Sequence, residues 1–214
     1  MSLGGKVRDR IRRLFGWGYP VPGRTWDAEY AGGNWNRLGE LADLGHYSVV
    51  VGYCHCLRPS GSILDVGCGE GILQEKLRPY GYRRYVGIDL SSEAIRRASS
   101  RTDRDTVFVQ ADATTFDPDG TFEVILFSES LYYLDRPTAV MRRFEGALAE
   151  DGVFIVSMHM TRGKQEIWDR LAQSYAILDE TRVTNSEGSQ WICRVLVPPA
   201  APRTRQRGPV WSRQ

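Results

Sequence analysis

Residues 62–73 read Ser-Ile-Leu-Asp-Val-Gly-Cys-Gly-Glu-Gly-Ile-Leu, and this stretch decides the fold. Its first residues are apolar around Asp65 and predict a short buried strand. Three glycines then follow at alternate positions: Gly67, Gly69 and Gly71. Apolar residues recur at helical spacing after them. A strand, a glycine loop and a helix predict a nucleotide-type ligand site, because glycine lets a ligand approach the main chain and a helix N-terminus adds unpaired N–H donors.

The spacing of the glycines excludes two common phosphate-binding loops. A dinucleotide-binding loop, G-x-G-x-x-G, needs its third glycine where this chain has Ile72. The pattern G-x-x-x-x-G-K-[ST] is absent too. The run Asp65-Val-Gly-Cys-Gly-Glu-Gly71 instead resembles the first motif of class I methyltransferases that depend on S-adenosylmethionine (SAM). The resemblance implies that SAM is the cofactor and that it contacts Asp65, Gly67, Cys68, Gly69 and Gly71.

Strand and helix patterns alternate beyond this loop. The expected strands are residues 63–66, 85–90, 106–109, 122–127, 152–158, 176–185 and 190–197. The expected helices are residues 38–57, 92–101 with Ser91 or Ser92 as the cap, 137–150 and 165–175. Such alternation predicts an α/β fold with a doubly wound, Rossmann-like, mostly parallel sheet. The resemblance implies seven strands in total, with a C-terminal antiparallel hairpin.

The composition fits one α/β domain. The chain has 214 residues, of which 42% are apolar, and this is enough for one sizeable core. No run approaches the ~20 apolar residues that span a bilayer, and residues 1–18 lack a signal-peptide pattern. The four cysteines show no disulfide-framework spacing. We therefore expect a cytoplasmic protein with no membrane span.

Charge divides the chain into three parts. We expect a basic extension at 1–24, a methyltransferase domain at 25–198 and a disordered tail rich in arginine and proline at 199–214. The extension fits a short amphipathic helix or a frayed end. Residues 17–198 are on balance acidic, so we do not expect a nucleic-acid partner, which would need a basic surface stripe. Nothing in the sequence indicates an oligomeric state.

The segment from Thr25 to Trp35 is rich in aromatic residues. Thr25 is a candidate helix cap, and the glycines at 32–33 would end that helix. The aromatic rings fit core packing equally well. The resemblance implies a lid over the cofactor here, and Tyr30 is then a further cofactor-binding residue.

Polar residues at strand ends are the next candidates, because ligands of open α/β sheets lie beyond the carboxyl ends of the strands. Asp89, with Leu90 beside it, ends the second strand, and its carboxylate is placed to accept both hydroxyls of a ribose. Asp112 and Ala113 follow the third strand and resemble the pair that meets the adenine. Each aspartate also fits a plain structural role, as a helix cap or a loop residue.

The run Ser128-Glu129-Ser130-Leu131-Tyr132-Tyr133-Leu134 follows the fourth strand. It resembles the small type-11 and type-12 methyltransferases and the nodulation-type N-methyltransferases, and the likeness covers roughly residues 25–198. In that superfamily this segment flanks the methionine portion of SAM, which makes Ser128 a cofactor candidate. Glu129 and His159, after the fourth and fifth strands, are candidates for a catalytic base. We favour His159 slightly, because an imidazole titrates near neutrality whereas a solvated carboxylate does not.

The predicted function is transfer of a methyl group from SAM to an oxygen or nitrogen of a small-molecule acceptor, such as a sugar, a lipid-like molecule or a secondary metabolite. Two alternatives remain open: an RNA methyltransferase that uses its basic ends as arms, and a non-catalytic binding subunit with the SAM fold. No metal is expected, since Cys54-His55-Cys56 is too closely spaced for a zinc site and lacks a second cluster.

Overall fold

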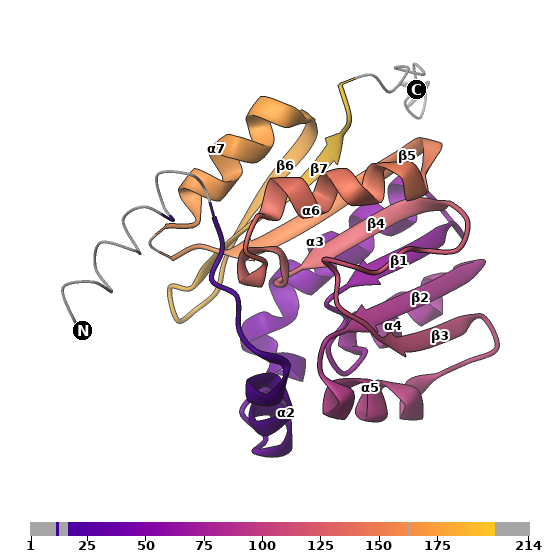
Figure 1. Cartoon of the computed structure of the whole chain (residues 1–214), viewed down its shortest axis with the longest axis vertical. Helices are drawn as coiled ribbons and strands as arrows, with labels where there is room; N and C mark the ends of the chain where they lie inside the picture. Colours follow the sequence, from indigo (N-terminus) through magenta and orange to yellow (C-terminus); the bar gives the residue numbers. More distant parts are fainter. Residues whose placement is uncertain (1–11, 13–16, 162, 200–214) are drawn as a thin grey trace, which may run out of the picture.

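A mixed sheet of seven strands forms the centre of the protein, in the order β3-β2-β1-β4-β5-β7-β6 (Figure 1). The computed structural model describes Arg12, residues 17–161 and residues 163–199. The strands are β1 (Ser62–Val66), β2 (Arg84–Asp89), β3 (Thr106–Gln110), β4 (Phe122–Ser128), β5 (Leu148–His159), β6 (Ala176–Thr184) and β7 (Gln190–Val197). Apart from Arg12 and residues 17–24, the predicted basic extension lies outside the described residues, as does nearly all of the predicted disordered tail.

The pairing of the strands confirms the predicted fold class. The first five strands are parallel to one another, and β7 runs antiparallel to both β5 and β6. All five residues of β1 are buried, as expected for a central strand of a parallel sheet covered on both faces. The strand order reverses at β1, because β2 and β4 flank it on opposite sides. Ligands of doubly wound sheets bind at such a switch point.

Helices cover both faces of the sheet (Figure 1). They are α2 (Gly23–Ala31), α3 (Leu41–Leu57), α4 (Ile72–Leu77), α5 (Ser92–Ala98), α6 (Pro137–Phe144) and α7 (Gln165–Ser174). Short 3₁₀ helices span Asn36–Gly39, Arg78–Tyr80, Ser99–Arg101, Leu131–Tyr133 and Glu145–Ala147. One core joins α6 and α7 to the sheet and contains the fully buried Phe144 and Trp168. A second core joins α3 and α4 to the other face through Val50 and Leu77.

The helix boundaries differ from the predictions at several places, and α5 for example ends at Ala98 before a 3₁₀ turn at residues 99–101. α2 begins at Gly23 after Pro22, so Thr25 lies inside the helix and does not cap it. α3 begins at Leu41, because residues 36–39 form a 3₁₀ turn first. α6 ends at Phe144, since β5 begins early and pairs Leu148 with Phe122. Ser91 caps α5 as predicted, and its hydroxyl accepts a hydrogen bond of 3.1 Å from the main-chain N–H of Ala94.

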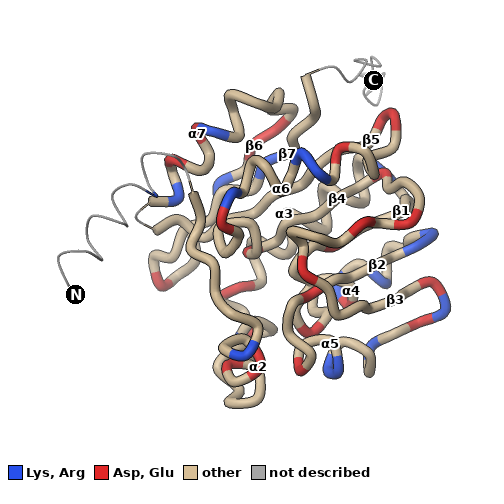
Figure 2. The backbone as a smooth tube through the Cα atoms, viewed as in Figure 1, with Lys and Arg blue, Asp and Glu red and all other residues tan. Residues whose placement is uncertain are grey.

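Charged residues are spread over many elements of the described chain. Figure 2 shows Lys and Arg on α2, α5, α6, α7, β2 and β7, with acidic residues between them. Many of these charges pair locally, as Glu93 does with Arg96 and Arg97. None of the described helices is long and apolar enough to cross a membrane.

Candidate active site

A cavity of about 480 Å³ lies at the carboxyl ends of the strands, at the switch point of the sheet. It brings together every residue predicted for the site except Gly71: Tyr30, Asp65, Gly67, Cys68, Gly69, Asp89, Leu90, Asp112, Ala113, Ser128, Glu129 and His159. Gly71 precedes α4 with a φ of +81°, and a Cβ there would lie 3.0 Å from the ring of Phe108. Gly71 therefore lets α4 and β3 pack closely and does not line the cavity.

The loop after β1 is held open by its glycines. Gly67 has a φ of +81°, and a Cβ added there would overlap the side chain of Ser130. Gly69 has a φ of +55°, and its Cβ would lie 2.8 Å from the hydroxyl of Tyr30. The main-chain N–H groups of Gly67 and Cys68 both donate to the carbonyl of Ile88, so the loop is anchored to β2. The result is a main-chain cradle that only glycine fills without strain.

Asp65 supplies a carboxylate beneath this cradle. The side chain is 1% exposed, and its Oδ2 accepts a hydrogen bond from the hydroxyl of Tyr85. Its Oδ1 has no hydrogen-bond partner among the described residues. Burial raises the pKa of Asp65 to about 7. A buried carboxylate oxygen without a partner at the cavity wall fits a cationic group, such as the ammonium of SAM.

Asp89 joins the end of β2 to the glycine loop. Its Oδ2 accepts from the main-chain N–H of Gly69 at 2.9 Å, and its Oδ1 accepts from that of Ser91 at 2.9 Å. Burial raises the pKa of Asp89, while these two hydrogen bonds favour its charged form. A carboxylate offers about four acceptor positions, so two remain for ligand hydroxyls. The geometry fits the predicted contact with a ribose.

Asp112 uses half of its carboxylate within its own turn. Its Oδ1 accepts from the main-chain N–H and the hydroxyl of Thr114, at 2.8 and 2.7 Å. Asp112 therefore stabilises its own turn, which is the structural role of a loop residue that the sequence analysis also allowed. Oδ2 is left to meet a ligand amine, and Ala113 lies beside it in the cavity wall. The two roles are compatible.

The aromatic segment lines the cavity from above the glycine loop. Trp26, Tyr30 and Trp35 all contribute to the wall. Tyr30 is buried at 8% exposure, and Trp26 meets Tyr133 edge to face at 4.7 Å between ring centroids. The segment thus contacts the strand-four loop across the cavity. We call residues 25–35 the lid segment for their place in the cavity wall; their packed rings fit core packing as well.

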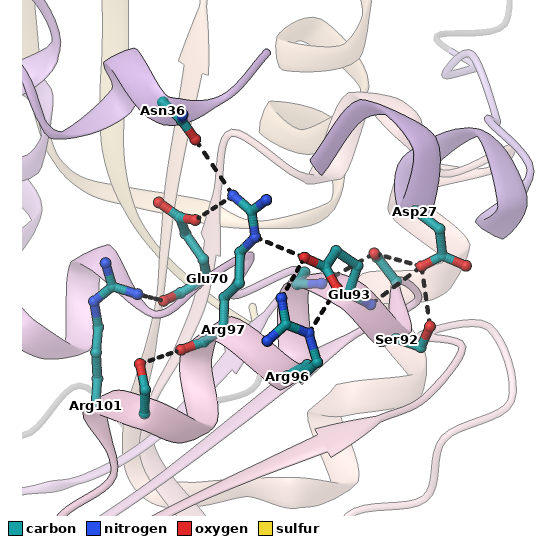
Figure 3. A network of polar contacts seen from close by, with 11 residues as sticks. Asp27, Asn36, Glu70, Ser92, Glu93, Arg96, Arg97 and Arg101 are labelled. Carbon is teal, nitrogen blue, oxygen red and sulfur yellow. Dashed lines mark hydrogen bonds and ion pairs between the residues drawn. The ribbon is translucent and has the colours of Figure 1, made fainter. Parts of the chain in front are cut away.

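A polar network holds this lid against α5 (Figure 3). Asp27 of α2 accepts hydrogen bonds from Ser91, Ser92 and Glu93 at the start of α5, at 2.7, 3.2 and 3.2 Å. On the same helix Arg97 donates to Asn36, which follows the lid, and to Glu70 of the glycine loop, at 3.3 and 3.5 Å. α5 therefore ties the lid and the glycine loop together.

Glu129 lies at the boundary between β4 and β5. Its backbone has a φ of +57°, which is uncommon for a residue other than glycine. Its Oε1 accepts from the hydroxyl of Ser157 at 2.9 Å. Its Oε2 accepts from the main-chain N–H of His159 at 2.8 Å and from the hydroxyl of Tyr132 at 3.0 Å. Burial raises the pKa of Glu129, although these donors favour the carboxylate.

This burial corrects the premise on which His159 was favoured as the base. Glu129 is not a solvated carboxylate, and its raised pKa makes it a better base near neutrality. Burial and the nearby charge of Lys164 lower the pKa of His159, which makes its imidazole a weaker base. Both side chains line the cavity, 30 residues apart in the sequence.

The cavity wall also contains residues that the sequence analysis did not single out, among them Asp43, His46, Lys164 and Trp191. Lys164 lies over the ring of Tyr132, with its Nζ 3.3 Å from the ring centroid, and burial lowers its pKa to about 8. The available signal was the pair of polar residues three positions apart at the start of an otherwise apolar helix, Asp43 and His46.

The Cys54-His55-Cys56 run lies on α3. Cys54 is buried, whereas His55 and Cys56 are exposed on the other side of the helix. No group of three metal-binding side chains occurs within the part of the chain that the structure describes.

Known proteins share both the sequence pattern and the fold. A family model described as "Methyltransferase domain" matches residues 5–194. Nodulation protein S of Azorhizobium caulinodans is 30% identical over 102 residues, which cover 46% of this chain and 49% of that protein. The eEF1A lysine and N-terminal methyltransferase of Danio rerio is 31% identical over 138 residues, which cover 62% of this chain and 19% of that protein. The match thus spans about half or less of these curated relatives.

Two solved methyltransferases show the same fold with S-adenosylhomocysteine (SAH) bound. The N-methyltransferase NodS from Bradyrhizobium japonicum superimposes with a TM-score of 0.71 at 18% identity, covering 83% of this chain and 98% of that one. The 1,6-didemethyltoxoflavin-N1-methyltransferase of Burkholderia thailandensis gives a TM-score of 0.65 at 20% identity, covering 80% of this chain and 84% of that one. The chain therefore belongs to the methyltransferase-domain family and has the class I fold of NodS, an N-methyltransferase solved with SAH bound.

Proposed function

We propose that this methyltransferase acts on an oxygen or nitrogen of a small-molecule acceptor. The observation that carries the proposal is the cavity, which runs from Asp112 beside β3 to Trp191 on β7 and has the lid segment in its wall. Its volume of about 480 Å³ lies within the range of ~300–1,000 Å³ that is usual for small-molecule sites. Sugars, lipid-like molecules and secondary metabolites are acceptor classes of suitable size.

In this proposal the side of the cavity formed by β1, β2 and β3 holds the cofactor. Asp89 accepts from the ribose hydroxyls, and Asp112 and the main-chain N–H of Ala113 pair with the adenine. Asp65 contacts the methionine portion, together with Ser128 at the end of β4, where the two sides of the cavity meet. SAM supplies a methyl group on a positively charged sulfur. The support for these assignments is the orphaned oxygen of Asp65 and the free acceptor positions of Asp89.

The side formed by β4, β5 and β7 then receives the acceptor. Its first task is to align the acceptor atom with the methyl carbon and the sulfur, and alignment alone supplies a large part of the acceleration. Its second task is to take the proton of a hydroxyl acceptor, which a positioned base performs. Glu129 and His159 are the two proposed bases in this part of the wall; burial raises the pKa of Glu129 and lowers that of His159.

The experiment combines binding and turnover. Calorimetry with SAM and SAH should show binding, and SAH release over a panel of hydroxylated and aminated small molecules should identify the acceptor class. The same assay with tRNA fragments and with a lysine-containing peptide covers macromolecular acceptors, because one relative is named as a protein methyltransferase. Turnover with RNA or peptide alone would contradict the proposal. The distributed charges of Figure 2 favour the small molecule.

A further inference from the structure

The beginning of α3 is clamped onto the β6–β7 hairpin. Gly45 packs so closely that a Cβ would lie 2.8 Å from Val183 on β6. The side-chain amide of Asn185, in the hairpin turn, donates to the carbonyl of Ala42 at 3.0 Å. Asp43 and His46, which neighbour these contacts, both line the cavity and are 6% and 1% exposed. The clamp therefore fixes two polar side chains at the end of the cavity beside β7.

His46 is buried with its hydrogen-bonding groups unpaired. Its ring lies 4.2 Å from that of Tyr47 and stacks on Trp191 at 5.1 Å and 15°. Neither ring nitrogen has a hydrogen-bond partner among the described residues, and the same holds for Oδ2 of Asp43. The nearest cation to that oxygen is the guanidinium of Arg37, at 3.9 Å. Buried polar atoms without partners are rare in folded proteins, so each needs an explanation.

A ligand group explains the unpaired imidazole better than an internal partner does. The rings of Tyr47 and Trp191 pack against the imidazole of His46, and the residue belongs to the cavity wall, so a ligand would have to displace part of this wall to reach one of the two buried nitrogens. Burial lowers the pKa of His46 to about 4, and the charges of His159 and Lys76 act in the same direction. The ring is therefore neutral at pH 7, with one nitrogen that accepts and one that donates a hydrogen bond.

The position of His46 favours the acceptor over the cofactor as that ligand. The residues that fit SAM stand at the ends of β1, β2 and β3. Trp191, on which His46 stacks, pairs with His159 across β5 and β7. These two strands lie beyond β4, on the opposite side of the switch point. Glu129, one of the two proposed bases, follows β4 and accepts a hydrogen bond from the main-chain N–H of His159 on β5.

We propose that His46 determines acceptor specificity by hydrogen-bonding a hydroxyl group of the acceptor at the β7 end of the cavity. This inference rests on the proposed function, because it presumes that a small-molecule acceptor enters there. A hydroxyl both donates and accepts, so it can pair with either ring nitrogen. A site built in this way rejects an analogue that lacks the hydroxyl, because the imidazole is then left buried and unpaired.

The first test measures how much the unpaired imidazole of His46 destabilises the protein when no ligand is bound. His46→Phe keeps a ring between Tyr47 and Trp191 and removes both unpaired nitrogens, so its midpoint of thermal unfolding should rise by about 2–6 °C. His46→Leu repeats the test with a smaller side chain. His55→Phe, an exposed histidine on the same helix, is the matched control and should leave the midpoint unchanged. Lower midpoints for both His46 variants would show that the nitrogens are paired in the free protein and would overturn the proposal.

The second test uses phenol and toluene as probes, in the presence of saturating SAH. Wild-type protein should bind phenol at least tenfold more tightly than toluene, and His46→Phe should lose this preference while His46→Gln keeps part of it. Equal binding of the two probes by wild type, or binding of neither, would overturn the proposal. A tenfold loss of SAH affinity in His46→Phe would do the same, by assigning His46 to the cofactor. Failure of the proposed function is distinct, since wild-type protein would then show no turnover of any small molecule.

Discussion

The two sides of the cavity satisfy their polar groups in different ways. On the cofactor side, Asp89 and Asp112 are fixed by main-chain N–H groups, and Asp65 by the hydroxyl of Tyr85. On the acceptor side, neither nitrogen of His46 has a hydrogen-bond partner among the described residues, and the ammonium of Lys164 lies over the ring of Tyr132. Main-chain groups therefore hold most of the polar side chains of the cofactor side in fixed positions. On the acceptor side both nitrogens of His46 are unpaired, whereas on the cofactor side only one buried carboxylate oxygen, Oδ1 of Asp65, lacks a partner among the described residues.

The largest effect should come from the residue between the two sides. If the acceptor is a hydroxyl, Glu129→Gln should lower the rate by ~10²–10⁴-fold with nearly unchanged SAH affinity, because a base is lost while the cradle is intact. His159→Ala should cost less, since burial lowers the pKa of that imidazole. The measurement is the pH–rate profile of both variants on the acceptor. For an amine acceptor, both losses should be far smaller.

Ser157→Ala is the control for this comparison. It removes one of the three donors to Glu129 and leaves the carboxylate in place. Its rate should therefore stay much closer to that of wild type. Wild-type rates and pH dependence in both Glu129→Gln and His159→Ala would mean that neither residue is the base.

Acid should destabilise the acceptor side through His46. Its pKa is about 4 in the folded protein and about 6.5 in the unfolded chain, so between these values only the unfolded chain takes up a proton. The free energy of unfolding should thus fall as the pH drops from 6.5 to 4, by about 3 kcal/mol from this residue. Burial also raises the pKa of Asp43 and of Glu129, so stability depends on these carboxyl groups too, and the difference between wild type and His46→Phe isolates the histidine. Parallel stability curves for the two proteins would contradict the prediction.

A side chain in the glycine loop should damage the cofactor side. Gly67→Ala adds a Cβ at a φ of +81°, where it overlaps the side chain of Ser130. The strained backbone and the overlap together should weaken SAH binding by about 100-fold. Gly52→Ala is the matched control, because Gly52 lies on α3 with nothing within 4 Å of an added Cβ. Calorimetry that gives both variants wild-type affinity would refute the assignment of the loop.

Substitution of Asp89 should weaken cofactor binding less than the change at Gly67. Asp89→Ala removes the acceptor for the ribose hydroxyls and should weaken SAM binding by about 10–100-fold, which corresponds to ~1.5–3 kcal/mol for a charge-assisted hydrogen bond. Thermal unfolding serves as the control, because the variant also loses the bonds to Gly69 and Ser91. A folded Asp89→Ala variant with an unchanged dissociation constant for SAM would contradict the assignment of Asp89 to the ribose.

The same contrast explains what the sequence could predict. The glycine loop, Asp89 and Asp112 are identified because each function depends on residues close together in the chain, at strand ends that apolar runs reveal. Gly71 shares the motif but packs against Phe108, since spacing does not distinguish a glycine that admits a ligand from one that admits a neighbouring helix.

The acceptor side could not be predicted in this way. It is assembled from α3, the ends of β4 and β5, Lys164 and β7, and the sheet order that places β7 beside β5 is a tertiary fact. His46 lies on a helix that was expected only to pack against the first strand. The surroundings of Glu129 could not be read from the sequence either, because its donors include Ser157 on β5 and Tyr132 in the strand-four loop.

The smallest effect should come from Asp27, which attaches the lid to the cofactor side. Its Oδ1 accepts from the hydroxyls of Ser91 and Ser92 and from the main-chain N–H of Glu93. These hydrogen bonds, that from Ser91 first, lower the pKa of Asp27, so their contribution to stability is present above its unfolded pKa of about 4 and is lost at lower pH. The group is largely open to solvent, so its loss should cost only about 1 kcal/mol, as for a helix cap.

Asp27→Ala should therefore lower the midpoint of thermal unfolding by about 2–4 °C and weaken SAH binding a few-fold. Glu29→Ala is the matched control on the same helix, because Glu29 bonds only to the nearby Asn34 among the described contacts and does not reach α5. If the lid helps to form the cofactor site, loss of the hydrogen bonds of Asp27 should weaken SAH binding. Equal SAH affinities for the two variants would instead show that α2 is held by its aromatic rings, Trp26 and Tyr30, and that the polar network of Figure 3 serves α5 alone.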